Sequence, residues 1–232
     1  MSIFKKATEK VAEEIFPGGA PYLKTNKFYC FVWIFVIGCV IGYVVEVLYA
    51  FYRKGHFVNK QGMIYGPFNQ IYGFGAVLFI LTLGNLYRIR AIYIFIISTV
   101  VGAAFEFACS WIQQLVFGSV SWQYGKSIFN IDGRISLKHS LFWGILGVLG
   151  IKIVFPWFFR LLLKIPRKVI APVSIIVFAF MIFNMSISAL AVARQNERRH
   201  CEEPSNGFER FLDKTYPDEF LKDIYPNMKF IS

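Results

Sequence analysis

The sequence predicts an all-α polytopic membrane protein, a helical bundle of about five transmembrane helices. Its 232 residues are 56% hydrophobic and 17% charged, with a mean hydropathy of +0.51, whereas charged residues make up about 25% of a soluble domain. Of the 14 acidic residues, only Glu46, Glu106 and Asp132 lie between Ile15 and Gln195. Because such a chain cannot stay dissolved, a soluble enzyme and a DNA-binding module are excluded. The net charge of +11 fits Lys and Arg at membrane borders, so we expect no nucleic-acid partner.

Five apolar runs are long enough, or nearly so, for the roughly 20 residues that a transmembrane helix needs. The runs are continuous and do not alternate with period two, which favours helices over a β-barrel. The second run is short, and the fourth contains Lys152 and Pro156, which predict a kink or a break. We therefore expect a multi-pass protein of the cell membrane. Within a transmembrane domain over 28–193, the expected spans are residues 28–51, 71–87, 91–117, 141–163 and 169–193.

The N-terminal segment, residues 1–27, is predicted to be amphipathic. Residues 3–16 place their large apolar side chains near one helical face, and the Pro and Gly residues of 17–21 then break the helix. Two interpretations stay open for this helix. It lies in the membrane interface, or it packs on the bundle.

The C-terminal tail, residues 194–232, is polar and contains a nine-residue echo. Residues 211–217 and 220–226 each place Phe and Leu before a Tyr-Pro pair. Each unit predicts one or two helical turns that a proline stops. Such a unit cannot bury its apolar face alone, so we expect it to dock on the domain or on a partner. A disordered tail is the alternative.

The cysteines predict neither a disulfide nor a metal site. Three of the four, Cys30, Cys39 and Cys109, lie in apolar spans, and Cys201 lies in the tail. No Cys-x-x-Cys pair is present in the sequence. We therefore expect no metal and no cofactor.

Two glutamates in apolar spans are the strongest functional signal. A carboxylate at the centre of a membrane helix costs about 2.5 kcal/mol or more, so it is by default a functional candidate. Glu46 follows Gly38 and Gly42 on one helical stripe, and Glu106 follows Gly102 in the same way. Small residues allow helices to approach closely, which turns the polar residues toward protein or water. The alternative is a buried structural carboxyl that is hydrogen-bonded or paired with a loop cation.

An internal echo relates the surroundings of the two glutamates. Residues 42–46 match residues 102–106 at the Gly and Glu positions, and a Tyr-Gly pair follows each glutamate by 19 or 18 residues. This pattern predicts two duplicated helix-loop-helix units related by an axis along the membrane normal. Chance similarity stays open as the alternative.

The polar loops over 58–75 and 121–137 are predicted to be re-entrant-like. They mix Gly, Asn, Tyr and Trp, and irregular backbone at membrane depth is tolerated where it is buried or lines a cavity. With five spans both loops lie on one side, because two crossings separate them. Arg134, Lys60 and Lys138 are the cations expected to reach a glutamate, and a polar lid without a ligand is the alternative. The candidate substrate-binding residues are Glu46, Asn59, Lys60, Tyr65, Tyr72, Glu106, Trp122, Tyr124, Asn130 and Arg134.

A combination of motifs carries a family resemblance. It joins Glu46 and Glu106 with the runs NKQGMIYGP (59–67), IYGFG (71–75), WQY (122–124), FNI (129–131) and GRISL (133–137), and with Trp143-Gly144. Over about residues 40–156 this resembles the bacterial putative ABC-transporter type IV family, the CmpB-like permeases. Where that family usually reads Asn-Arg-Gly and Trp-Asp-Tyr-Ser, this chain reads NKQG (59–62) and WQYG (122–125). The resemblance implies a permease fold and a transport component.

Three functions follow from these observations. The first is a transport component with a polar site near Glu46, Glu106 and Arg134. Because the chain lacks a Gly-x-x-x-x-Gly-Lys-Ser/Thr phosphate loop, ATP-driven transport would need a separate ATPase subunit, and five spans imply a homodimer or a larger assembly in the lipid bilayer. The second is a membrane-embedded enzyme that acts on a lipid or an isoprenoid. The third is a non-catalytic assembly subunit.

Overall fold

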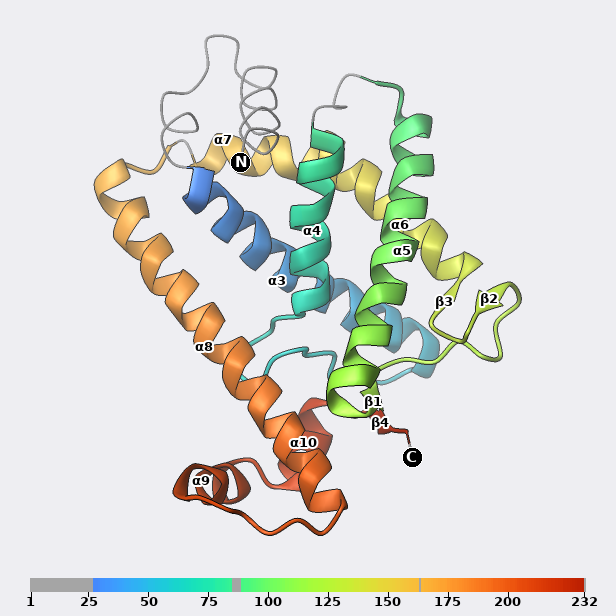
Figure 1. Cartoon of the computed structure of the whole chain (residues 1–232). Helices are drawn as coiled ribbons and strands as arrows, with labels where there is room; N and C mark the ends of the chain where they lie inside the picture. The colour runs from blue at the N-terminus through green and yellow to red at the C-terminus, as the bar shows by residue number, and fades with distance from the viewer. Residues whose placement is uncertain (1–26, 85–88, 163, 232) are drawn as a thin grey trace.

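The computed structural model describes residues 27–84, 89–162 and 164–231, and in these ranges the predicted all-α membrane class is confirmed. The N-terminal helix predicted over 3–16 lies outside them. Helices dominate the chain, and the strands are two residues long each (Figure 1). The helices are α3 (Lys27–Lys54), α4 (Gln70–Leu83), α5 (Ala91–Phe117), α6 (Leu137–Leu149), α7 (Phe155–Leu162), α8 (Arg167–Arg199), α9 (Gly207–Thr215) and α10 (Asp218–Ile224). The strands are β1 (Ser119–Val120), β2 (Asn130–Ile131), β3 (Ile135–Ser136) and β4 (Lys229–Phe230).

Of the five expected spans, four are long enough to cross a membrane, and the second is a shorter apolar helix. Phe28–Lys54, Ala91–Phe117, Leu137–Leu162 and Arg167–Arg199 are long and apolar enough to cross a membrane, whereas α4 has 14 residues. At 1.5 Å per residue, α4 is about 21 Å long, which is less than the roughly 30 Å of the hydrocarbon core. Figure 1 shows α4 beginning part-way along α5 rather than level with its end. The polar loop before α4 therefore takes the place of its first turns.

In the fourth span, where a kink or a break is predicted, the helix continues over Leu137–Leu162 but contains a π-helical turn. A π-helical turn, Gly150–Val154, separates α6 from α7, and Pro156 is the second residue of α7. Proline is tolerated in the first turn of a helix, where its missing N–H is not needed. Lys152 in the π-helical turn donates to the carbonyl oxygen of Ile89 at 2.8 Å, which gives its charged end a polar partner inside an apolar helix.

Two close-packed helix pairs, α3 with α4 and α5 with α6, repeat the same contacts. A Cβ at Gly73 of α4 would lie 2.4 Å from Cys39 of α3, and a Cβ at Gly144 of α6 would lie 2.3 Å from Thr99 of α5. Glycine is therefore required at both crossings. Cys39 precedes Glu46 by the same seven positions by which Thr99 precedes Glu106.

The aromatic residue before each of these glycines also repeats its contact. A Cβ at Gly42 would lie 2.1 Å from the Tyr72 ring, and a Cβ at Gly102 would lie 2.4 Å from Trp143 Cβ. The two aromatic rings stack on each other, with centroids 5.4 Å apart and an interplanar angle of 25°. Equivalent residues of the two pairs thus meet at one point, as expected for the predicted duplication around an axis.

The tail is docked on the end of α8. Arg194, which is only 3% exposed, donates to both carboxylate oxygens of Asp213 at 3.0 and 3.1 Å. Arg198 Nε donates to Asp218 at 2.9 Å. An apolar cluster packs beside these ion pairs and joins the tail to the loop before α4. Its members are Ile64, Ile187, Ala191, Leu212, Tyr216 and Leu221.

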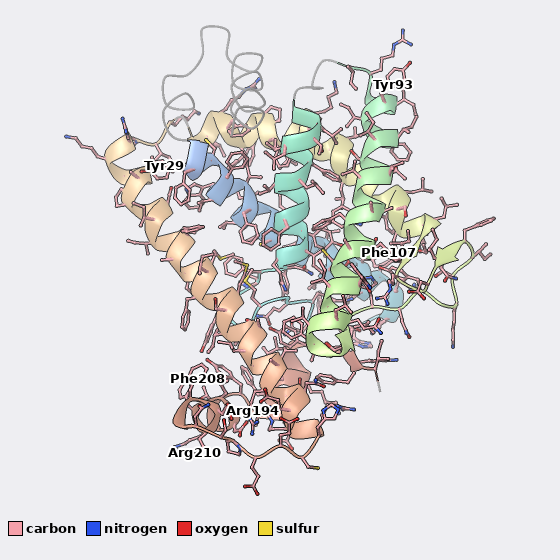
Figure 2. All side chains as sticks on the ribbon, in the orientation of Figure 1. Tyr29, Tyr93, Phe107, Arg194, Phe208 and Arg210 are labelled. Atoms are coloured by element: carbon pink, nitrogen blue, oxygen red, sulfur yellow. The ribbon has the colours of Figure 1, made fainter. Side chains whose placement is uncertain are left out.

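The last residues of the tail reach back to the bundle. Strand β4 pairs antiparallel with β1, directly after α5. Figure 2 shows Arg194, Phe208 and Arg210 at the tail end of the molecule, with Tyr29 and Tyr93 at the opposite end. Aromatic side chains of this kind are common where helices meet the membrane surface.

Candidate functional site

A cavity of about 1390 Å³ lies between the helices and is lined by both polar loops and by the end of the tail. Residues of α3, α4, α5, α6 and α8 contribute to its walls. Of the predicted site residues, the lining includes Glu46, Asn59, Lys60, Tyr72, Glu106, Trp122 and Tyr124. Tyr65, Asn130 and Arg134 lie outside this lining.

Glu46 is held by one aromatic donor and one cation. The Tyr72 hydroxyl donates to Glu46 Oε1 at 2.6 Å. The Lys60 ammonium lies 3.2 Å from Glu46 Oε2, and both side chains are about a quarter exposed. The glutamate of the first helix pair therefore has its counter-charge within the chain.

Glu106 is held by two neutral donors. The Tyr124 hydroxyl donates to Oε1 at 2.8 Å, and the Trp143 indole N–H donates to Oε2 at 3.0 Å. Glu106 is buried, with 6% of its surface exposed. Burial, together with the neighbouring Glu106 carboxylate, raises the pKa of Tyr124 well above its ordinary value. The hydroxyl of Tyr124 therefore keeps its proton and acts as a donor.

The prediction that Arg134 contacts Glu46 or Glu106 is wrong. Arg134 Nε donates to Asp132 at 2.7 Å, Nη1 donates to Ser110 Oγ at 3.3 Å, and Nη2 donates to Gln114 Oε1. Ser110 lies one helical turn beyond Glu106 on the same stripe of α5, so the guanidinium sits nearer the end of the helix. Its carbon also lies 5.8 Å from the ring centroid of Phe107, which Figure 2 labels on α5. Among the described residues, the cation that forms an ion pair with Glu46 is Lys60, and no ion pair joins a cation to Glu106.

Two other predicted site residues contact the tail. The hydroxyls of Tyr65 and Tyr216 are 2.7 Å apart, and Asn59 Nδ2 lies 3.3 Å from the carbonyl oxygen of Asp223. Asn59 also belongs to the cavity lining. These side chains therefore connect the loop before α4 to α9 and α10.

Asn130 and Trp122 hold the hairpin formed by β2 and β3. Asn130 Nδ2 donates to the carbonyl oxygen of Ser127 at 2.8 Å, and its Oδ1 accepts from Gly133 N at 3.1 Å. Trp122 Nε1 donates to the carbonyl oxygen of Arg134 at 2.9 Å. These contacts fix the shape of the loop that delivers Tyr124 to Glu106.

Sequence reasoning missed two residues of the cavity wall. Trp143 was noted as a family motif and not as a partner of Glu106. His139 was not among the predicted site residues, but its ring stacks on Tyr124 with centroids 4.0 Å apart, and its Nδ1 lies 2.7 Å from Ser136 Oγ. The sequence position of both residues could have indicated them, since each lies shortly after the polar loop, on helix α6, which pairs with α5. Over the described ranges, no group of three or more His, Cys, Asp or Glu residues could hold a metal ion.

Comparison with known proteins gives one family. The family model described as putative ABC-transporter type IV matches residues 33–189. The matched range contains both glutamates, their four donors and most of the cavity lining. No curated protein and no solved structure matches the chain.

Proposed function

The chain belongs to the putative ABC-transporter type IV family, and from this premise we propose that its cavity carries a transported substrate past Glu46 and Glu106. It is a multi-pass membrane protein, as its four long apolar helices indicate. We place it in the cell membrane as a transport component.

One observation carries the proposal. Two intramembrane carboxylates occupy equivalent positions in two repeated helix pairs, and both line the same cavity. Because a carboxylate inside the bilayer is costly, the two positions call for a function. In transporters built from repeats, the substrate site lies at the interface between the repeats near the middle of the membrane.

The energy source lies outside this chain. The sequence contains no Gly-x-x-x-x-Gly-Lys-Ser/Thr phosphate loop, so a separate ATPase subunit would hydrolyse ATP. The described residues also provide few membrane-spanning helices for a complete permease, which favours a homodimer or a larger assembly.

A native cysteine provides the test. Cys109 lines the cavity, whereas Cys30 and Cys39 are fully buried and Cys201 is exposed in the tail. In the Cys201→Ser variant, a water-soluble maleimide should therefore react with Cys109 alone. In native membranes, trapping with ATP and vanadate should change the rate of this reaction, because the cavity of a transporter opens and closes with the ATPase cycle. An unchanged rate would contradict the proposed function.

A further inference from the structure

We propose, building on the function above, that the cavity binds its ligand through an ammonium group, which Glu106 holds as Glu46 holds the ammonium of Lys60. The ligand is then an organic amine with an apolar portion. The contacts of the two carboxylates, their equivalence in the repeated pairs and the remaining cavity lining lead to this ligand class.

The two carboxylates differ in charge balance. Glu46 has the Lys60 ammonium at 3.2 Å. For Glu106, the described residues provide hydrogen bonds from Tyr124 and Trp143 but no ion pair. The indole N–H can only donate, so Oε2 of Glu106 serves as an acceptor. Glu106 therefore lines the cavity as a hydrogen-bond acceptor that no cation of the described residues contacts.

The repeated helix pairs identify what the second glutamate lacks. Tyr72 and Trp143 occupy equivalent positions, and each donates to the glutamate of its own pair. The second donor comes from the polar loop in both cases, and here the pairs differ. The loop before α4 supplies the charged Lys60, whereas the loop before α6 supplies the neutral Tyr124. The chain thus already shows an ammonium bound at one of two equivalent carboxylates, and a ligand ammonium would complete the other.

The remaining lining determines the rest of the ligand. Apolar side chains also line the cavity; they include Phe74, Ile112, Ile145 and Leu149. The cations Arg53, Lys54, Lys126 and Lys229 also line it, and all four are exposed. Solvent and salt screen such charges over about 10 Å. An amine that carries an alkyl or aryl group therefore fits better than an anion.

A series of matched probes tests this ligand class. Hexylammonium, hexanol and hexanoate share one alkyl chain and differ in charge. The full-length Cys201→Ser protein is held in a non-ionic detergent and an amine-free buffer, and alkylation of Cys109 by a water-soluble maleimide is followed. Cys109 lies one turn from Glu106 and lines the cavity, so a bound probe shields it. Hexylammonium should slow alkylation about tenfold at about ten times its Kd, and the other two probes should not at equal concentration.

Variants assign the effect to Glu106. Glu106→Gln should lose protection by hexylammonium while Cys109 still reacts without the probe. Glu203→Gln, which changes an exposed acid of the tail, should keep full protection. Glu106→Asp retains the charge at a shorter reach, so it should weaken protection and preserve the preference for the cation. This second variant keeps the test decisive if Glu106→Gln does not fold.

Each other outcome overturns the proposal. Equal protection by hexanol would mean that only the apolar lining binds, and protection by hexanoate would mean an anion site. If none of the three probes protected Cys109, Glu106 would bind no organic ammonium and could bind only a proton. In each of these cases Cys109 still reacts, so the transport proposal stands on its own ATP and vanadate test. If Cys109 does not react at all, the cavity is closed to water and both proposals fail.

Discussion

At the scale of single residues, the two glutamates show how a carboxylate is kept inside an apolar bundle. Each accepts a hydrogen bond from an aromatic donor on the paired helix and a second contact from a polar loop. Hydrogen bonds to a charged group contribute more than neutral ones, and a donor lost from a buried group leaves that group unsatisfied.

Replacing Tyr124 by Phe tests this arrangement, because it removes the hydroxyl that donates to Glu106 and keeps the ring. We expect Tyr124→Phe to lower the free energy of unfolding by about 2 kcal/mol, measured as a lower thermal midpoint in detergent. Tyr52→Phe is the matched control, since Tyr52 is 86% exposed at the end of α3. Equal midpoints for the two variants would show that the bond from Tyr124 contributes nothing.

The sequence was sufficient to find the glutamates but not their partners. A charge in an apolar run is visible without a structure, and Glu46 and Glu106 were found in that way. Which loop cation reaches them depends on the path of the loop. The turn held by Asn130 turns Arg134 toward Ser110 and Gln114, so Lys60 is the residue that pairs.

At the scale of helices, close packing depends on glycines that face aromatic side chains. Gly102→Ala should destabilise the protein, because the new Cβ would lie 2.4 Å from Trp143. Overpacking typically costs about 1–3 kcal/mol, whereas alanine favours a helix by about 1 kcal/mol over glycine. A net loss of thermal stability therefore reports the clash.

The control for this substitution is Gly125→Ala in the polar loop, where a Cβ would meet no atom within 4 Å. We expect its thermal midpoint to stay at the wild-type value. If Gly102→Ala were as stable as Gly125→Ala, the close approach of α5 and α6 would be refuted.

Part of the repeat could not be read from the sequence for a physical reason. In one pair Gly38 of α3 faces Ala76 of α4, and in the other Ser98 of α5 faces Gly147 of α6. The glycine at the crossing lies on the first helix of one pair and on the second helix of the other. The close packing is therefore the same in both pairs, although the residues at equivalent positions differ. The second span was expected to be short, and α4 begins within one residue of its predicted start, directly after its capping residue Asn69.

The docking of the tail should depend on pH through Asp213. Hydrogen bonds from Arg194 lower the pKa of Asp213 below its ordinary value of about 3.9. A carboxylate with a lowered pKa stabilises the folded state above its unfolded pKa, and this contribution is lost as the pH falls through the folded pKa. We expect amide protection of α9 and α10 in hydrogen exchange to stay constant from neutral pH to about pH 5 and to fall below about pH 4.

Asp213→Asn provides the comparison for this pH series. It leaves Arg194 without its two-pronged carboxylate partner, so protection of α9 and α10 should be weaker at neutral pH, by roughly 2 kcal/mol. Its loss of protection on acidification should also be smaller. Identical pH profiles for wild type and variant would show that the contact between Arg194 and Asp213 does not hold the tail.

At the scale of the whole molecule, two repeated helix pairs, α8 and the tail enclose one cavity. The prediction that both polar loops share a side came from span parity alone, and in the structure both loops line this cavity. The number of spans could not predict that the tail takes part, yet residues 224–229 of the tail also line the cavity. An apolar face on a short polar segment indicates that the segment docks on another surface, but it does not identify that surface.

Side-specific labelling in sealed vesicles tests the central claim, that both glutamates line one water-filled cavity entered from the side of the polar loops. Cys109 in Cys201→Ser and the added cysteines of Asn59→Cys and Gly125→Cys are each exposed to an impermeant maleimide in right-side-out and inside-out vesicles. We predict that all three react in the same vesicle orientation, while the fully buried Cys30 stays unreactive in both. Labelling of Asn59→Cys and Gly125→Cys from opposite sides, or a Cys109 that is closed to water from both, would contradict it.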